Sequence, residues 1–304
     1  MENTEIIKID HLSKSFGQFQ AVKDVSFTVN KGDVFGFLGP NGAGKSTTIR
    51  CMLSLIQPNA GQISLFGKDL KTHRNELLSK VGSIIEKPDF YRYLSAEKNL
   101  EIFARISGTD VSKRAIAEML DFVGLNGRGK DKVSGFSHGM KQRLGIAQTL
   151  LHQPELIVLD EPTTGLDPQG IVEIRNLILR LKTEQNKTVI LSSHQLSEIE
   201  LISNRMVIIN KGQSIVEGNV TDLLNTQEMV VQMEVDDLDK AQRILTDQFR
   251  ESSFKKINER ILEIQIEKHK VPRMNEAMVQ HGLMVHALEP KRKLEDFFMK
   301  IIQS

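Results

Sequence analysis

The feature that most constrains this chain is a glycine-rich stretch with the spacing glycine, four residues, glycine, lysine, serine. An apolar run, Val34 to Leu38, precedes it, and a helical pattern from Thr48 to Ile56 follows it. A phosphate-binding loop requires this order of strand, loop and helix. Glycine lets the backbone curl until successive N–H groups face one anion, and the following helix adds its positive end. The expected nucleotide contacts are Gly39, Pro40, Asn41, Gly42, Ala43, Gly44, Lys45, Ser46 and Thr47.

Two side chains of this loop have expected roles in chemistry. Lys45 is placed to reach the β- and γ-phosphates, and the Ser46 hydroxyl is placed to ligate Mg²⁺. An ordinary glycine-rich turn is the alternative interpretation, and the complete set of motif positions disfavours it. The sequence therefore predicts a site for a nucleoside triphosphate with Mg²⁺.

Charge and cysteine content exclude several classes of protein. The 304 residues include 40 basic and 39 acidic side chains, a net charge of +1, without a long block of either sign. No nucleic-acid partner is expected, because proteins that bind nucleic acid carry a basic patch or stripe. Cys51 is the only cysteine. An intrachain disulfide is therefore impossible, and a buried, inert thiol in a reducing cytosol is expected.

The sequence gives no sign of a signal peptide or a membrane span. Residues 1–5 are acidic and polar rather than basic and then apolar. No run approaches the roughly eighteen apolar residues that a spanning helix needs. A hydrophobic content of 39% supports a soluble globular core, in one large domain or two. A chain of this kind that works at a membrane has to be held there by another protein.

Two further apolar runs end in side chains that suit nucleotide chemistry. Residues 156–159 read as a buried parallel strand, and Asp160 and Glu161 follow directly. Buried charges are costly, so acids at such a strand end usually face a site, although capping of the next turn is the alternative. Asp160 is expected to hold Mg²⁺ through its water shell, and Glu161 to orient or deprotonate an attacking water. A second run, residues 188–193, ends at His194, a candidate contact for the γ-phosphate.

The order of these motifs resembles the ATP-binding cassette of ABC transporters. A signature-like segment at residues 136–140, the loop at residues 165–167 and His194 as a switch complete the set. The resemblance implies an α/β fold over residues 5–222, with a mixed-sheet core and an N-terminal antiparallel β part. It also implies a helical subdomain at about residues 90–152, where helical patterns cover residues 96–107 and 112–123.

The resemblance assigns further contacts to ATP. Phe16 stands where an aromatic residue of the family stacks on adenine, although a lone phenylalanine is more often part of a core. Asp167, in the loop after the acidic strand end, is expected to help bind the nucleotide. Lys45, Glu161 and His194 are then the expected catalytic residues.

The family pairs two cassettes head to tail, which gives the signature-like segment its expected role. Ser137 and Gly139 of one copy would close over the ATP held by the phosphate loop of the second copy. Capping alone also explains Ser137, because it precedes a helical pattern that runs to about His152. The hydrolytic site is therefore expected to lie between two copies of the chain.

The sequence departs from the family at two places. The signature is usually Leu-Ser-Gly-Gly-Gln, and here Phe136, His138 and Met140 replace three positions. The serine and the second glycine, which make the phosphate contacts, remain. Glu86 stands where most cassettes have a glutamine that touches Mg²⁺, so it is an expected metal ligand. Its negative charge beside a triphosphate requires compensation by the metal or by a partner.

Together with residues 90–100, Glu86 resembles the bacitracin-resistance and lantibiotic self-immunity exporters. That resemblance implies an ATPase subunit at the cytoplasmic face of the membrane, which powers peptide-antibiotic export through separate integral-membrane permease subunits. One alternative is a soluble cassette acting on ribosomes or DNA, which would show two cassettes, a long coiled coil or a basic linker. Another is a nucleotide sensor that does not hydrolyse ATP. Glu86 leaves the sensor open, whereas Asp160, Glu161 and His194 argue against it.

The pattern changes after the cassette, and residues 227–304 are expected to form a small accessory α+β domain. Strand patterns at residues 229–235, 254–257, 261–266 and 284–288 alternate with helical patterns at residues 238–249, 271–281 and 294–302. Strand, helix, two strands, helix and strand is the order of a ferredoxin-like fold. Three roles remain open for this tail: a dimer brace, a regulatory domain and packing alone.

Overall fold

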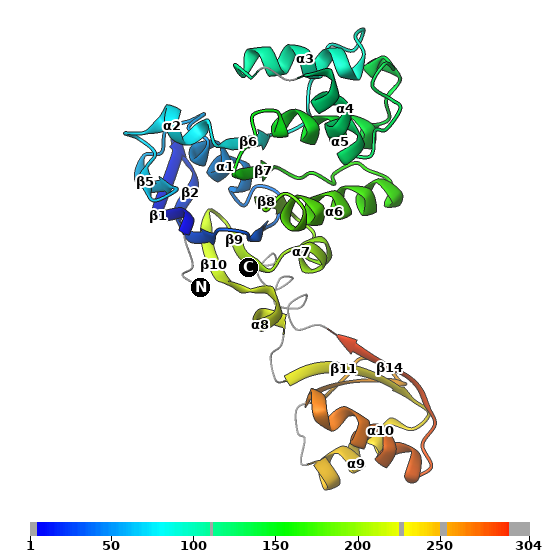
Figure 1. Cartoon of the computed structure of the whole chain (residues 1–304). Helices are drawn as coiled ribbons and strands as arrows, with labels where there is room; N and C mark the ends of the chain where they lie inside the picture. The colour runs from blue at the N-terminus through cyan, green and yellow to red at the C-terminus, as the bar shows by residue number, and fades with distance from the viewer. Residues whose placement is uncertain (1–4, 110–111, 225–227, 250–253, 292–304) are drawn as a thin grey trace. The chain divides into compact units, whose positions relative to one another are not determined.

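The computed structural model describes residues 5–109, 112–224, 228–249 and 254–291 (Figure 1). The chain divides into two compact units, Met1–Asn219 and Val220–Ser304. Each unit has its own hydrophobic core. Among the described residues, no helix is both long enough and apolar enough to cross a membrane.

A ten-stranded sheet forms the frame of the first unit, in the order β5-β4-β1-β2-β10-β9-β3-β8-β7-β6. One end is antiparallel, because β1 pairs with β2 and β4, and β4 pairs with β5. The other end is parallel, with β3 between β8 and β9 and with β7 between β6 and β8. The strands are β1 (Glu5–Phe16), β2 (Phe19–Asn30), β3 (Val34–Leu38), β4 (Ala60–Leu65), β5 (Lys68–Asp69), β6 (Val81–Ile84), β7 (Leu156–Leu159), β8 (Thr188–Ser193), β9 (Arg205–Asn210) and β10 (Gln213–Asn219).

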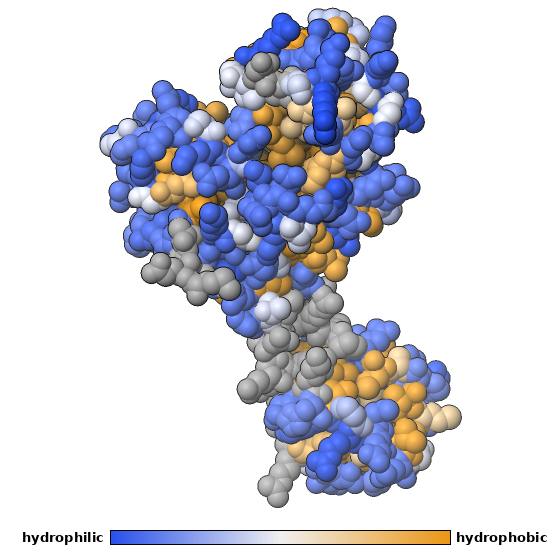
Figure 2. Space-filling model, viewed as in Figure 1, coloured by the Kyte–Doolittle hydropathy of each residue, from blue (hydrophilic) through white to orange (hydrophobic). Residues whose placement is uncertain are grey.

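Three helices of this unit, α3, α4 and α5, lie together at one end of the unit, away from the antiparallel strands (Figure 1). On the face drawn in Figure 2, hydrophobic residues gather where these three helices meet the rest of the unit, and most of the remaining surface is hydrophilic. The helices are α1 (Lys45–Met52), α2 (Arg74–Leu78), α3 (Ala96–Ile106), α4 (Lys113–Phe122), the 3-10 turn η1 (Val133–Gly135), α5 (His138–Leu150), α6 (Pro168–Thr183) and α7 (Leu196–Ile202).

Serine caps explain where the three gathered helices begin. The side chains of Ser95, Ser112 and Ser137 accept hydrogen bonds from backbone N–H groups at the start of α3, α4 and α5. Such a bond satisfies one of the N–H groups that a helix start leaves unpaired. The helices predicted for residues 96–107 and 112–123 and the helix capped by Ser137 are confirmed, with shifts of only a residue or two at their ends.

One boundary in this unit differs from the sequence prediction. The first helix ends at Met52 rather than Ile56, because Ser54 adopts a left-handed conformation with φ of 54°. The Ser54 N–H then bonds to the Cys51 carbonyl and the Leu55 N–H to the Arg50 carbonyl, which closes the helix as a Schellman motif. Phe16, the expected adenine contact, is the last residue of β1 and pairs across a tight hairpin with Phe19.

The core of the first unit lies against the middle of the sheet. The strands β7 and β8 are buried along their whole length, as the apolar runs predicted. Phe27 of β2 packs between Phe35 and Phe37 of β3, with ring centroids 5.5 and 5.2 Å apart. Burial on both faces favours continuous apolar strands and leaves polar chemistry to the strand ends.

The second unit has the element order that the sequence predicted. A four-stranded antiparallel sheet, ordered β12-β13-β11-β14, packs against α9 and α10. This strand order and the helix positions are those of a ferredoxin-like fold. Its elements are α8 (Val220–Leu224), β11 (Glu228–Val235), α9 (Leu238–Phe249), β12 (Phe254–Lys256), β13 (Ile261–Glu267), η2 (Lys268–Lys270), α10 (Val271–Gln280) and β14 (Val285–Lys291). The helix predicted for residues 294–302 lies outside the described residues.

Candidate active site

The carboxyl ends of three adjacent parallel strands meet at one edge of the sheet. Leu38, at the end of β3, pairs with Ser193 at the end of β8, and Leu159, at the end of β7, pairs with Leu191. Ligands of open α/β sheets bind at this edge, where loops leave the strands. The phosphate loop, the acidic pair and the histidine predicted from the sequence follow these three strand ends directly.

The phosphate loop connects β3 to α1 in a closely packed turn. Gly44 has φ of 104°, a left-handed conformation that favours glycine, and a Cβ built on it would lie 2.7 Å from the carbonyl oxygen of Ala21. Lys45 is buried, and its Nζ donates hydrogen bonds to the carbonyl oxygens of Gly39 and Pro40 at 2.7 and 3.3 Å. The ammonium group is therefore held inside the curve of the loop, where the motif expects phosphate.

Glu161 lies at the centre of the site. Its Oε1 forms an ion pair with Lys45 Nζ at 3.2 Å, and its Oε2 accepts hydrogen bonds from Thr164 Oγ1 at 2.8 Å and His194 Nδ1 at 3.1 Å. The structure thus brings the three predicted catalytic residues together. The φ of Glu161 is 48°, a left-handed conformation that is costly for a residue with a Cβ. A bond from the Glu161 N–H to Ser192 Oγ at 2.8 Å holds it there.

The pKa of Glu161 reflects opposing influences. Burial of the side chain raises the pKa, while the Thr164 hydroxyl, the Lys45 ammonium and His194 lower it, and the net result is a pKa below the ordinary value. Because the folded pKa is depressed, the ionised form stabilises the fold above the unfolded pKa. This contribution is lost as the pH falls through the folded pKa. Glu161 is therefore a carboxylate at neutral pH, able to accept a proton or orient water.

Asp160 and Ser46 offer the oxygen atoms that Mg²⁺ prefers. Asp160 is buried at the end of β7, and its Oδ1 accepts a hydrogen bond from Ser192 Oγ at 2.5 Å, which fixes the carboxylate. Ser46 is in the first turn of α1, directly after Lys45. A hydroxyl and a carboxylate suit a small hard cation that completes its shell with phosphate oxygens and water. In the ranges that the structure describes, no group of three or more His, Cys, Asp or Glu side chains is arranged to hold a metal by itself.

A buried carboxylate beneath the site joins two of its loops. Glu198, in α7, accepts hydrogen bonds at Oε2 from Thr163 Oγ1 at 2.7 Å and from Ser193 Oγ at 2.8 Å. The carbonyl oxygen of Ser193 in turn accepts the N–H of Gly39, the first residue of the phosphate loop, at 3.2 Å. The loops that follow β3, β7 and β8 are therefore connected through the end of β8.

The signature-like segment opens α5. Ser137 Oγ accepts the N–H of Met140 at 3.2 Å, so the capping role predicted for Ser137 is confirmed. A Cβ built on Gly139 would meet only Leu166 and Gly170, at 3.9 and 4.0 Å. His138, which stands between Ser137 and Gly139 in the sequence, directs its Nε2 to the carbonyl oxygen of Thr164 at 3.3 Å. The segment is thus in contact with the loop that follows Glu161.

Glu86 has a cationic partner in the structure. It follows β6 with φ of 65°, and its carboxylate forms an ion pair with the guanidinium of Arg50 in α1. The side chain of Glu86 is 69% exposed and that of Arg50 is 38% exposed. The compensating charge that the sequence called for is therefore supplied by the protein, and the role of Glu86 as a metal ligand stays a prediction.

Two more predicted contacts lie on separate elements. The ring of Phe16 is half exposed, and Lys14 Nζ lies 5.2 Å from its centroid. An exposed aromatic face can stack on a base, which a phenylalanine inside the core cannot do. Asp167 caps α6, because its Oδ1 accepts the N–H of Gly170 at 2.9 Å. The roles of Phe16 and Asp167 in binding ATP remain predictions.

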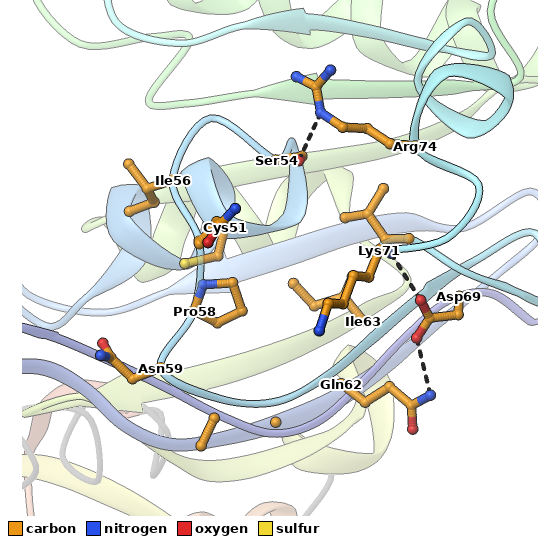
Figure 3. A pocket seen from close by; sticks show the side chains of 14 residues that line it. Cys51, Ser54, Ile56, Pro58, Asn59, Gln62, Ile63, Asp69, Lys71 and Arg74 are labelled. Atoms are coloured by element: carbon orange, nitrogen blue, oxygen red, sulfur yellow. Dashed lines mark hydrogen bonds between the residues drawn. The ribbon is translucent and has the colours of Figure 1, made fainter.

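A pocket of about 350 Å³ lies beside α1, β4 and the start of α2 (Figure 3). Its lining includes Cys51, Lys71 and Arg74, and Arg74 Nε donates to Ser54 Oγ at 2.8 Å. No residue of the phosphate loop lines it. The pocket is therefore separate from the strand ends at which the predicted catalytic residues meet.

Comparison with known proteins places the chain. A family model described as ABC transporter matches residues 22–164. The bacitracin transport ATP-binding protein of Bacillus licheniformis is 41% identical over 298 residues, which cover 98% of this chain and 97% of that protein. The chain belongs to the ATP-binding proteins of the ABC transporter family.

Two further similarities agree with this assignment. A lantibiotic transport ATP-binding protein of Streptococcus pyogenes is 40% identical over 224 residues, 74% of this chain and 95% of that protein. The solved structure of an ATP-binding subunit of an ABC transporter shares 31% identity, with a TM-score of 0.63, over 72% of this chain and 91% of that one. The cassette fold predicted from the sequence is confirmed, and the chain is an ATP-binding cassette ATPase.

Sequence reasoning missed the residues that support the predicted catalytic groups. Ser192 and Ser193 were recognised only as the end of an apolar run, although two serines at a buried strand end are themselves a signal of a polar site. Thr163, Thr164 and Glu198 carried no motif of their own. Their roles depend on pairings across up to 35 positions of sequence, which periodicity does not reveal.

Proposed function

We propose that this chain is the ATP-hydrolysing subunit of an exporter that removes a peptide antibiotic of the bacitracin or lantibiotic kind from the membrane. The similarity to transport proteins for bacitracin and lantibiotics supports the substrate class. Separate integral-membrane permease subunits would carry the substrate and would hold the chain at the cytoplasmic face of the membrane. Two copies of the chain would pair head to tail around ATP.

The contacts of Glu161 with Lys45 and His194 carry the proposal for hydrolysis. In this mechanism Lys45 binds the β- and γ-phosphates, and His194 contacts the γ-phosphate. Glu161 orients a water molecule and accepts its proton at the carboxylate. When Lys45 Nζ moves from Glu161 to the phosphates, one interaction that lowers the pKa of Glu161 is weakened. Glu161 then becomes a stronger base at the moment when ATP is bound.

The remaining predicted contacts position the nucleotide. Phe16 would stack on the adenine, and Ser46, Asp160 and Glu86 would hold Mg²⁺. The ion, when bound, neutralises charge that develops on the phosphates. Ser137 and Gly139 of the second copy would close over the ATP, and Asp167 would help to bind the nucleotide. The backbone N–H groups of the phosphate loop would bind the rest of the triphosphate.

Replacing Glu161 with glutamine tests the proposed chemistry. Glu161→Gln should retain ATP binding and slow hydrolysis by at least about a hundredfold, because an amide cannot accept the proton of water. ATP-bound dimers should then accumulate. Equilibrium ATP binding, phosphate release and size-exclusion chromatography measure these effects. Glu118→Gln, which changes an exposed residue of α4 in the same way, is the control. Near-normal turnover of Glu161→Gln would remove Glu161 from its assigned role.

The transport partner requires a separate experiment. The chain should be isolated from membranes of its native cell under gentle detergent, and the accompanying apolar polypeptides identified. Recovery of a polypeptide with several membrane spans, whose loss sensitises cells to a peptide antibiotic, is the expected result. Recovery of ribosomal proteins or nucleic acid instead would favour the soluble cassette.

A further inference from the structure

His138 connects the start of α5 to the loop that follows the catalytic carboxylate. Its Nε2 lies 3.3 Å from the carbonyl oxygen of Thr164. Because a carbonyl oxygen only accepts hydrogen bonds, the imidazole must carry its hydrogen on Nε2 to make this bond. A Cβ built on Gly165 would lie 3.8 Å from the same ring nitrogen, so the ring also packs against the next residue of the loop.

Thr164 is attached to Glu161 on its other side. The Thr164 hydroxyl donates to Glu161 Oε2 at 2.8 Å, and the Thr164 N–H bonds to the Glu161 carbonyl at 3.2 Å. The same Oε2 accepts the bond from His194. A displacement of Thr164 therefore changes the direction in which the Glu161 carboxylate points. Three residues, His138, Thr164 and Glu161, form an unbroken path from α5 to the centre of the site.

The position of His138 gives this path a function. It lies between Ser137 and Gly139, the two residues that the proposed function places against the ATP of the second copy. A helix moves as a rigid element, so a shift of the first turn of α5 toward that ATP carries His138 with it. The signature segment usually has a glycine at this position, and a glycine has no side chain that reaches Thr164.

We propose that His138 is a positioning residue that couples the two nucleotide sites of the dimer. ATP bound against the signature segment of one copy fixes His138 of that copy. The His138 to Thr164 bond then orients Glu161 of the same copy, which serves the other ATP. His138 therefore strengthens the dependence of hydrolysis at each site on occupancy of the other, beyond what pairing of the two copies supplies. This inference rests on the proposed head-to-tail dimer.

Two substitutions at residue 138 and one at residue 164 test the path. His138→Gly removes the ring, whereas His138→Gln retains an N–H donor at nearly the same distance. Thr164→Val removes the hydroxyl and keeps the shape of the side chain. The matched control is Lys113→Gly, because Lys113 follows the capping Ser112 of α4 as His138 follows Ser137. This control separates the loss of the ring from the effect of a glycine at the start of a helix.

The measurement is the ATPase rate of the full chain as a function of ATP concentration, together with equilibrium ADP binding. The unaltered chain should have a Hill coefficient between one and two. His138→Gly should lower the turnover number about two- to tenfold, the factor that one hydrogen bond supplies, and lower the Hill coefficient toward one. ADP binding should not change. His138→Gln should restore cooperativity. Thr164→Val should reduce the turnover number less in the His138→Gly chain than in the unaltered chain, because the two residues act through one path.

Several outcomes would overturn the inference while leaving the proposed function intact. One is an unaltered chain that hydrolyses ATP without cooperativity. Others are a His138→Gly variant that keeps both turnover and Hill coefficient, and a His138→Gln variant that is impaired as much as His138→Gly. If Lys113→Gly reproduces the loss, the effect belongs to helix stability. An unaltered chain that does not hydrolyse ATP contradicts the proposed function itself.

Discussion

Glu86 departs from the family pattern, and a second residue of the chain compensates its charge. An uncompensated carboxylate beside a triphosphate would repel it, yet here Arg50, five residues after Lys45 in the chain, supplies the opposite charge. Both side chains are partly exposed, so solvent screens the pair and its contribution to folding is small, on the order of 1 kcal/mol or less. The pair therefore adds little to the stability of the fold.

Removing the charge of Glu86 should separate hydrolysis from export. Glu86→Gln should leave the ATPase rate of the isolated chain within a few-fold, because glutamine retains an oxygen that can face a metal shell. Resistance to the peptide antibiotic should fall more than hydrolysis, because the loop responds differently to the γ-phosphate and to the membrane partner. The two should be measured side by side in cells and vesicles that contain the permease subunits.

The Arg50→Gln variant is the matched comparison for Glu86→Gln. It removes the other half of the ion pair and leaves the glutamate uncompensated, so its ATPase rate should fall further than that of Glu86→Gln. If hydrolysis and export fall in proportion in Glu86→Gln, Glu86 acts as a simple metal ligand. If neither changes, the substitution is neutral and the charge has no part in coupling.

Cys51 should be chemically inert in the folded chain. Its side chain is 1% exposed, and burial raises the pKa of the thiol to about 11, with the charge of Lys14 acting in the opposite direction. At pH 8 the folded thiol should therefore react with iodoacetamide at least about a hundredfold more slowly than the thiol of the urea-unfolded chain. Alkylation followed by mass spectrometry measures both rates. Equal rates would show that the thiol is exposed and ionised in the fold.

At the scale of elements, the end of β8 organises the site. Ser192 fixes Asp160 and the backbone of Glu161, and Ser193 links the phosphate loop to Glu198. Together these bonds join the loop after β3, the loop after β7 and helix α7 to the same strand end. The arrangement explains how Glu161 keeps its left-handed backbone conformation, which is strained for any residue other than glycine.

Removing the carboxylate of Glu198 should loosen this connection. Glu198→Ala leaves two buried hydroxyl groups without their acceptor, which should lower the free energy of unfolding by about 1–3 kcal/mol. Glu198→Gln retains one oxygen and should cost less. Urea unfolding measures both, and the turnover number should fall with little change in the KM for ATP. Glu118→Gln, an exposed control on α4, should change stability by less than about 0.5 kcal/mol. A Glu198→Ala variant as stable as this control would contradict the inferred connection.

The sequence predicted elements well where a local pattern was sufficient. Apolar runs predicted β7 and β8, helical patterns predicted α3 and α4, and Ser137 predicted the start of α5. The first helix was predicted too long because apolar residues continue past its true end, where Ser54 turns the backbone left-handed. The role of Glu198 could not be assigned from sequence, because the fold brings its hydrogen-bond partners Thr163 and Ser193 to it from two different strand ends. Arg50 likewise became the partner of Glu86 only through the fold.

At the scale of the whole molecule, the second unit has a hydrophobic core and a sheet of its own. The buried residues Val231, Ile264 and Met274 belong to a cluster made only of residues from the second unit. The sheet of that unit is closed by pairings among β11 to β14 alone. A sheet of four strands with a helical layer and its own core meets the conditions for independent folding.

Each unit should therefore fold when produced by itself. A chain of residues 220–304 should unfold cooperatively in urea, and its circular dichroism should show both helix and strand, because its core needs no side chain from the cassette.

A chain of residues 1–222 should bind ATP with the affinity of the full chain, since every predicted nucleotide contact lies within it. Its ATPase rate as a function of protein concentration then separates the roles left open for the tail. A rate that falls on dilution only in the shortened chain identifies the tail as a dimer brace, whereas unchanged behaviour excludes that role. A tail that unfolds without cooperativity, or a cassette that loses ATP binding, would show that the two units depend on each other.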